Sequence, residues 1–135
     1  MADYIYVYLT SLGVMTAIDA VWLGLVAPKF YKKHIGYIMT DKPIWLSAII
    51  FYLIFILGVA VFVVYPGWRN SESLTKIALQ GALLGLVSYA TYDLTNQATL
   101  KGWPFIVTAV DLMWGTFLTA LVSVVSVLVL KKFLN

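Results

Sequence analysis

Residues 44–65 read IWLSAIIFYLIFILGVAVFVVY, an unbroken apolar run that contains no charged side chain. A helix of about 20 such residues is long enough to cross the roughly 30 Å hydrocarbon core of a bilayer. Pro43 stands just before the run and Pro66-Gly67 just after it. Because proline suits the first turn of a helix and interrupts its interior, we expect the helix to begin and end at these residues. The run predicts a transmembrane helix.

Three further apolar stretches of similar length flank this one, at residues 4–27, 74–96 and 104–130. Pro28 follows the first of them, Pro104 begins the last, and Lys131-Lys132 close it. The four spans leave only short loops between them. The sequence therefore predicts an all-α, four-helix transmembrane bundle that forms a single integral membrane domain over residues 1–135, with no soluble domain.

The composition agrees with this fold and excludes several kinds of site. Of 135 residues, 62% are hydrophobic and 11% charged, and the mean hydropathy is +0.93, whereas about a quarter of the residues of a soluble domain are charged. The chain has no cysteine and a single histidine, His34, which excludes disulfides, thiolate sites and zinc sites with several histidines. We expect no metal and no cofactor.

The net charge of +3 comes from loops and chain ends. In a membrane protein such charges report orientation and contact with lipid, so we expect membrane lipid as a partner and no nucleic acid. No Lys or Arg precedes the first span, whereas Lys29, Lys32 and Lys33 follow it. The positive-inside rule then predicts that both termini lie outside.

Three acidic residues lie deep in the predicted spans, namely Asp19, Asp93 and Asp111. A charged Asp at mid-membrane costs about 2.5–3.5 kcal/mol on insertion scales, so such residues are candidates for function. Counted from the nearest helix ends at about 1.5 Å per residue, each lies roughly 10–14 Å below the same surface of an antiparallel bundle. We expect the three carboxyl groups to converge inside it.

Polar, aromatic and small residues share helix faces with these acids, since positions three and four apart face the same way. The second span is expected to contribute mainly to the wall of the site, through Ser47, Phe51 and Tyr52. The full candidate site for a ligand or proton is Asp19, Asp93, Asp111, Asn96, Trp22, Trp114, Tyr92, Thr16 and Thr108.

Two sequence patterns accompany the acids. Gly81-x-x-x-Gly85 allows close helix packing, either within a monomer or between the chains of a homodimer. Residues 16–22 and 108–114 both follow the pattern T-A-[I/V]-D-x-x-W. The two copies lie at different distances from their helix starts, which argues against a duplication of whole halves and leaves local convergence or chance.

Several functions are compatible with buried acids among aromatic residues. The first is the binding or transport of a small cationic, amphipathic or proton-coupled solute, through charge and cation–π attraction. The second is an intramembrane enzyme that divides acid and base roles between aspartates and acts on a lipid or isoprenoid. The third is a structural, hydrogen-bonded polar knot without a ligand. A site for Mg²⁺ or Ca²⁺ has suitable oxygen ligands but no supporting spacing.

Three segments carry a resemblance to a known family: DAVWLG at residues 19–24, YDLTNQATLKGWP at 92–104 and DLMWG at 111–115. On these segments the chain resembles a family of small bacterial four-helix inner-membrane proteins known only as a domain of unknown function, number 2177. The resemblance covers nearly the whole chain. It implies a multi-pass protein of the bacterial inner membrane and implies no activity.

Overall fold

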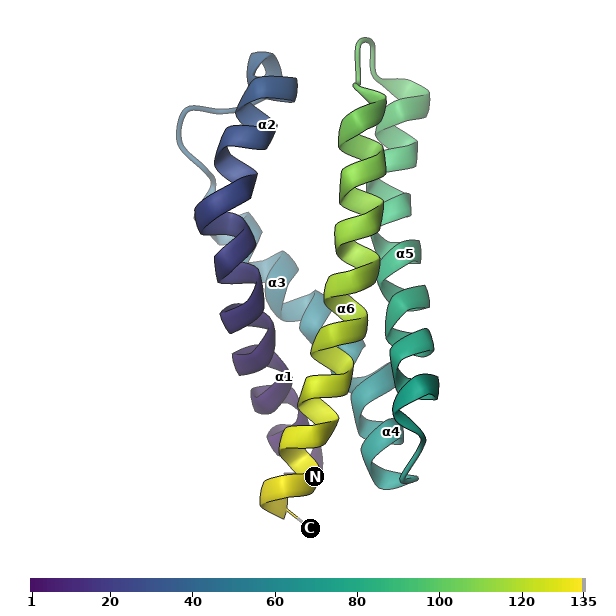
Figure 1. Ribbon diagram of the computed structural model, residues 1–135. Coiled ribbons are helices and arrows are strands. Elements are labelled where there is room, and N and C mark those ends of the chain that lie inside the picture. The colour runs from purple at the N-terminus through teal and green to yellow at the C-terminus, as the bar shows by residue number, and fades with distance from the viewer. Residues whose placement is uncertain (135) are drawn as a thin grey trace.

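The structure is a computed structural model that describes residues 1–134, and this part of the chain forms helices and short connections only. Four long helical runs make up the bundle (Figure 1). The first is α1 (Ala2–Val21), η1 (Trp22–Val26), α2 (Ala27–Ile35) and η2 (Gly36–Ile38); the second is α3 (Trp45–Val59), η3 (Ala60–Val64) and α4 (Tyr65–Arg69); the others are α5 (Leu74–Thr99) and α6 (Phe105–Leu134). The predicted all-α bundle is confirmed.

The expectation that helices end at Pro28 and Pro66 is wrong. Each proline lies just after a π-helical turn, η1 or η3, and the helix continues beyond it. In these turns the N–H of Ala27 donates to the carbonyl of Trp22, and that of Tyr65 to the carbonyl of Ala60. The wider turn accommodates the proline ring, which would otherwise clash with the carbonyl four residues earlier. The first helical run therefore continues to Ile38.

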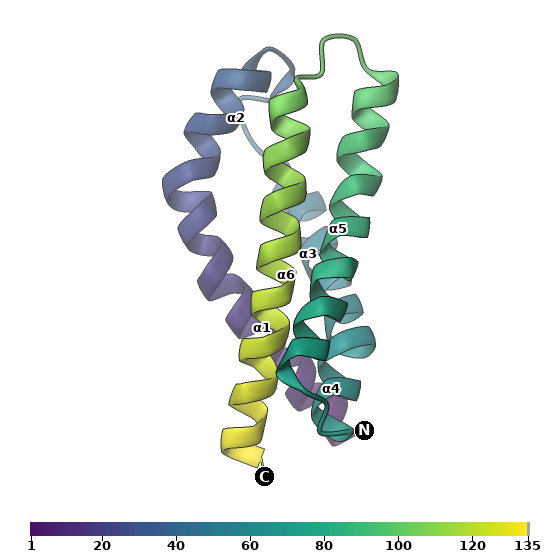
Figure 2. The same ribbon diagram turned by 45° about the vertical axis from the view of Figure 1, so that its right-hand side comes forward.

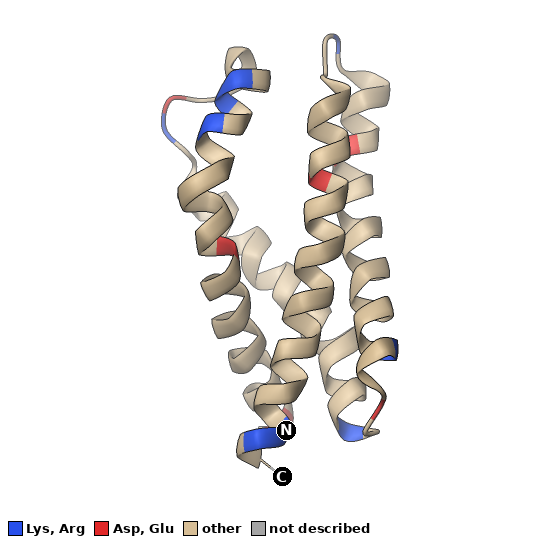
Figure 3. Ribbon diagram, in the orientation of Figure 1, with Lys and Arg blue, Asp and Glu red and all other residues tan. Residues whose placement is uncertain are grey.

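Three of the four runs are long and apolar enough to cross a membrane: Ala2–Ile38, Trp45–Arg69 and Phe105–Leu134. The fourth helix, α5, contains more polar residues but makes the most extensive contact in the bundle, along α6. Lys and Arg gather at the two ends of the molecule, away from its middle (Figure 3). The protein is thus an α-helical membrane protein.

Glycines set the close approach of α5 to α6. A Cβ atom at Gly81 would lie 2.7 Å from the Oγ of Ser123 and 2.8 Å from the carbonyl oxygen of Thr119. A Cβ at Gly85 would overlap the carbonyl oxygen of Gly115. The predicted Gly81-x-x-x-Gly85 stripe is therefore occupied by packing within one chain.

The two ends of the bundle differ in how tightly they pack. The main apolar core includes Val7, Val64, Ile77 and Val127, which belong to the end where both termini lie (Figure 2). At the opposite end, α2, the α5–α6 turn and the start of α6 meet in a small separate cluster of Ile35, Trp103 and Val107, flanked by Phe30 and Tyr31. The candidate site lies towards this second, more open end.

A crossing by α5 places the α5–α6 turn on the same side of the membrane as the end of α2. The structure supports this, because the hydroxyl of Tyr37 donates a hydrogen bond of 2.6 Å to the carbonyl of Gly102 in that turn. We expect topology reporters inserted after Lys33 and after Lys101 to report one side, and a reporter after Lys132 the other. A Lys101 reporter on the side of Lys132 would contradict a crossing by α5.

Candidate functional site

Asp111 on α6 is held by a residue of α2. Its side chain is buried, at 5% exposure, and its Oδ1 accepts a short hydrogen bond from the hydroxyl of Tyr31. The ring of Trp22 stands edge-on to Tyr31, with centroids 6.5 Å apart. Tyr31 can reach Asp111 only because the first helix continues past Pro28, so the π turn of η1 also shapes the site.

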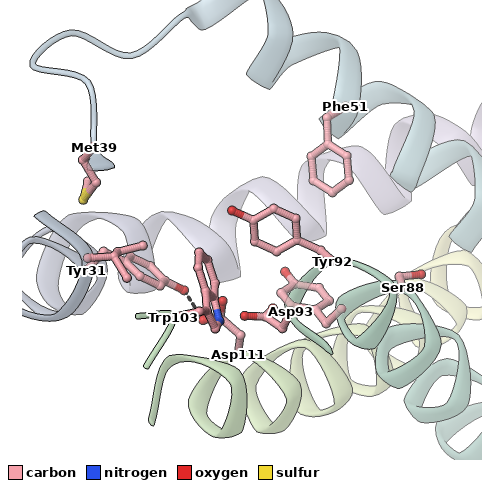
Figure 4. A pocket seen from close by; sticks show the side chains of 10 residues that line it. Tyr31, Met39, Phe51, Ser88, Tyr92, Asp93, Trp103 and Asp111 are labelled. Carbon is pink, nitrogen blue, oxygen red and sulfur yellow. Dashed lines mark hydrogen bonds between the residues drawn. The ribbon is translucent and has the colours of Figure 1, made fainter. Parts of the chain in front are cut away.

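Asp93 on α5 is completely buried, and neither of its carboxyl oxygens has a hydrogen-bond partner among residues 1–134. Its carboxyl group lies within reach of the carboxyl of Asp111 (Figure 4). The two acids come together because Gly85 and Gly115 bring the α5 and α6 backbones into contact a few residues away. A buried carboxylate without a donor costs roughly 1–3 kcal/mol, unless a proton shared with Asp111 or a ligand supplies the donor.

Asp93 and Asp111 form part of the wall of a cavity of about 490 Å³. Apart from the two acids and Ser88, its wall is aromatic or apolar. The complete lining is Tyr31, Ile35, Met39, Phe51, Ser88, Tyr89, Tyr92, Asp93, Trp103 and Asp111. The lining contains no basic side chain, so the acid pair has no counter-charge there.

Asp19 lies outside this cavity. It is buried on α1 at 5% exposure, and its Oδ2 accepts a hydrogen bond of 2.8 Å from the hydroxyl of Tyr52 on α3. The indole nitrogen of Trp114 lies near the same carboxyl without meeting hydrogen-bond geometry. Tyr89 is within electrostatic reach of all three acids. The acids therefore form a facing pair and one separate, tyrosine-bound acid.

The two T-A-[I/V]-D-x-x-W segments face each other. The rings of Trp22 and Trp114 stack with centroids 4.7 Å apart and planes at 15°. Tyr52 binds Asp19 close to Trp114, and Tyr31, which lies beside Trp22, binds Asp111. The similarity in sequence thus corresponds to a paired arrangement in space, between antiparallel helices.

The remaining candidate residues have different positions. Tyr92 lines the cavity, and Asn96 lies beside Tyr92 but outside the lining. Thr108 donates a hydrogen bond of 2.8 Å to the side-chain oxygen of Gln97 and accepts one of 3.1 Å from Trp103, so it fixes the α5–α6 turn. Thr16 is exposed. Of the nine candidates, Asp93, Asp111 and Tyr92 line the cavity.

Sequence reasoning missed Tyr31, which belonged to a predicted loop. A signal was present in the sequence. Ala27, Tyr31 and Ile35 lie four residues apart, and lysines occupy positions between them, which is the pattern of an amphipathic helix. No group of three or more His, Asp or Glu side chains within residues 1–134 is placed to hold a metal ion.

The Asp19–Tyr52 pair is expected to stabilise the contact between α1 and α3. Asp19→Leu leaves the Tyr52 hydroxyl without its partner, and Tyr52→Phe leaves the Asp19 carboxyl without its donor, each at a cost of about 1–3 kcal/mol. In the double variant neither group remains without its partner. Its loss of unfolding free energy should therefore be clearly smaller than the sum of the losses in the two single variants. Denaturation of the parent, the two single variants and the double variant in detergent measures these free energies. Additive losses of unfolding free energy would show that the hydrogen bond does not couple the helices.

Comparison with known proteins places the chain in a family. A family described as "Predicted membrane protein (DUF2177)" matches residues 4–128. No curated protein and no solved structure matches the chain.

Proposed function

Since the chain belongs to this DUF2177 family of predicted membrane proteins, whose description names no activity, we propose from the site itself that it binds a small cationic or amphipathic ligand in the cavity at Asp93 and Asp111. The observation that carries the proposal is the Asp93 carboxyl, fully buried and without a donor, facing a second carboxyl at an otherwise apolar cavity.

Electrostatics favours a cation at this place. Two carboxyl groups that face each other in a low-dielectric environment cannot both stay ionised unless a cation lies between them; without one, they share a proton. The lining offers no Lys, Arg or His for this purpose. An ammonium group against Asp111 would supply the positive charge, and a small rearrangement of the fully buried Asp93 side chain would let it accept an N–H as well.

The aromatic wall favours the same ligand. Tyr31, Tyr89, Tyr92 and Trp103 line the cavity together with the acids, and the face of such a ring attracts a cation by about 0.5–1 kcal/mol at exposed sites and about 2 kcal/mol when desolvated. Transport of the ligand would further require a second conformation that opens the acid pair to the opposite side of the membrane.

An intramembrane enzyme is the second candidate, and one observation favours it. The two facing carboxyl groups have unlike surroundings, because Asp111 accepts a hydrogen bond from Tyr31 and Asp93 accepts none. Carboxyl groups in unlike environments can divide acid and base roles. Incubation with lipid and isoprenoid extracts, followed by mass spectrometry, tests this: turnover lost in Asp93→Asn supports an enzyme, and unchanged extracts contradict it.

We also propose a cellular location and an oligomeric state. The resemblance of the sequence supports a multi-pass position in the bacterial inner membrane. Packing of Gly81 and Gly85 against α6 supports a monomer, because a homodimer would need another face. Membrane lipid surrounds the bundle, and nucleic acid has no part in this function.

A thermal-shift series on purified protein tests ligand binding. Primary amines of increasing chain length are compared with the alcohols of equal length, which match them in shape but carry no charge. A ligand that binds only the folded state raises its melting temperature by mass action, so we expect concentration-dependent stabilisation by amines and none by alcohols. Equal effects of amine and alcohol, or no effect of either, would contradict the proposed function.

A further inference from the structure

The mouth of the cavity is apolar and lies between α3, α5 and the segment that follows α2. Its outermost residues are Phe51, Tyr92 and Met39, which are 57%, 59% and 46% exposed. The acids lie at the other extreme, since Asp93 is fully buried and Asp111 nearly so. The cavity thus has an acidic inner wall and an apolar entrance (Figure 4).

This entrance exists because the second helical run starts late and at an angle. The segment from Met39 to Ile44 is not helical and descends along the bundle before α3 begins, and α3 then crosses the bundle obliquely (Figure 1). The first half of α3 has little helix cover. The large apolar side chains of residues 45–54 are exposed by 41–70%: Trp45, Leu46, Ile49, Ile50, Phe51, Leu53 and Ile54.

In a membrane such an uncovered apolar face is solvated by hydrocarbon chains and not by water. The mouth beside Phe51 therefore opens towards the bilayer, and whatever reaches the acids through it must be compatible with lipid. Charge complementarity indicates the other end of the ligand, because a cation satisfies the paired carboxyl groups without a proton shared between them.

We propose that the ligand is a long-chain primary amine, which enters from the bilayer between α3 and α5 and places its ammonium group against Asp111 and Asp93 while its chain occupies the mouth at Phe51, Tyr92 and Met39. This inference rests on the proposed function and narrows it to one class of amphiphile. A primary ammonium has three N–H donors for the two carboxyl groups, whereas a quaternary ammonium has none.

Photolabelling in lipid nanodiscs tests the inference with dodecylamine that carries a diazirine in its chain. After irradiation, the modified peptides are mapped by mass spectrometry. We expect labels concentrated in the segments that contain Phe51 and Tyr92. Unlabelled dodecylamine should remove them, whereas dodecyltrimethylammonium and dodecanol should compete about tenfold less well or worse, since a hydrogen bond to a charged group contributes at least about a factor of ten.

Two pairs of variants of this chain provide matched controls. Phe51→Trp narrows the mouth and should reduce the labelling, whereas Phe62→Trp, at a 68% exposed position in the same helical run outside the cavity, should not. The Asp93→Asn/Asp111→Asn variant should lose the labels from both segments, and Asp19→Asn should keep them. The competition series uses only the parent chain, so the test does not depend on the folding of any variant.

The outcomes separate the two proposals. Labels spread over all exposed apolar segments, indifferent to competitors, would overturn lateral entry of an amine. If butylamine competes as strongly as dodecylamine, or the quaternary amine as strongly as the primary one, the proposal of a long-chain primary amine is overturned. Cation binding at the acid pair would then still stand. Failure of every amine, both here and in the thermal-shift series, would overturn the proposed function itself.

Discussion

Gly115→Ala is expected to destabilise the bundle by about 3 kcal/mol or more, at or beyond the upper end of what overpacking usually costs. A Cβ atom at this position would overlap the ring of Tyr89 near its attachment, where the side chain cannot swing away. Gly85→Ala should act similarly, because its Cβ would meet the Gly115 carbonyl oxygen and the side chain of Thr119. Separation of α5 from α6 would also draw Asp93 away from Asp111.

Gly13→Ala is the matched control for this prediction. Gly13 lies inside α1, and no atom lies within 4 Å of an added Cβ. Replacement of an unconstrained helical glycine by alanine stabilises by roughly 0.5–1 kcal/mol, so this variant should unfold at or above the parent's denaturant concentration. Unfolding of all three variants in detergent measures the difference. Equal stability of Gly115→Ala and Gly13→Ala would show that the glycines do not set the α5–α6 distance.

Asp93→Asn should fold at least as well as the parent and lose most of its affinity for amines. The amide keeps the size of the side chain and can donate an N–H to the neighbouring Asp111 carboxyl, which removes the conflict between two buried acceptors. We expect a gain of about 1 kcal/mol or more without ligand. The affinity for amines should fall about tenfold or more, because a hydrogen bond to a charged group is lost.

Stabilisation combined with loss of binding is the pattern expected of a residue kept for function at the expense of stability. Asp19→Asn serves as the control, because Asp19 lies outside the cavity and already has Tyr52 as a partner. It should leave the response to amines unchanged. An Asp93→Asn protein that is destabilised, or that keeps the parent's full response to amines, would identify Asp93 as a structural residue.

The fold was predictable because the hydrophobic runs are long and interrupted by few charges. The helix ends at Pro28 and Pro66 were not, since a π turn that accommodates a proline leaves no signature in composition. That misplaced end moved Tyr31 into a predicted loop and hid the hydrogen bond to Asp111.

The proximity of Asp93 and Asp111 was predictable from depth along antiparallel helices and from the glycine stripe. The separate position of Asp19 was not, because depth along a helix does not fix which neighbour a side chain meets. Tyr52 on α3 binds Asp19, and the inclination of α3 depends on packing that no local pattern encodes. The aromatic mouth at Phe51 and Met39 follows from the same inclination.

The most direct test of cation binding at the acid pair is isothermal titration of hexylamine into the protein in lipid nanodiscs, with empty nanodiscs as the baseline. Parent protein and the Asp93→Asn/Asp111→Asn variant are compared at equal concentration. We expect saturable binding of one amine per chain to the parent, and a signal from the variant equal to that of empty nanodiscs. The same saturable isotherm for both proteins would contradict a site at Asp93 and Asp111.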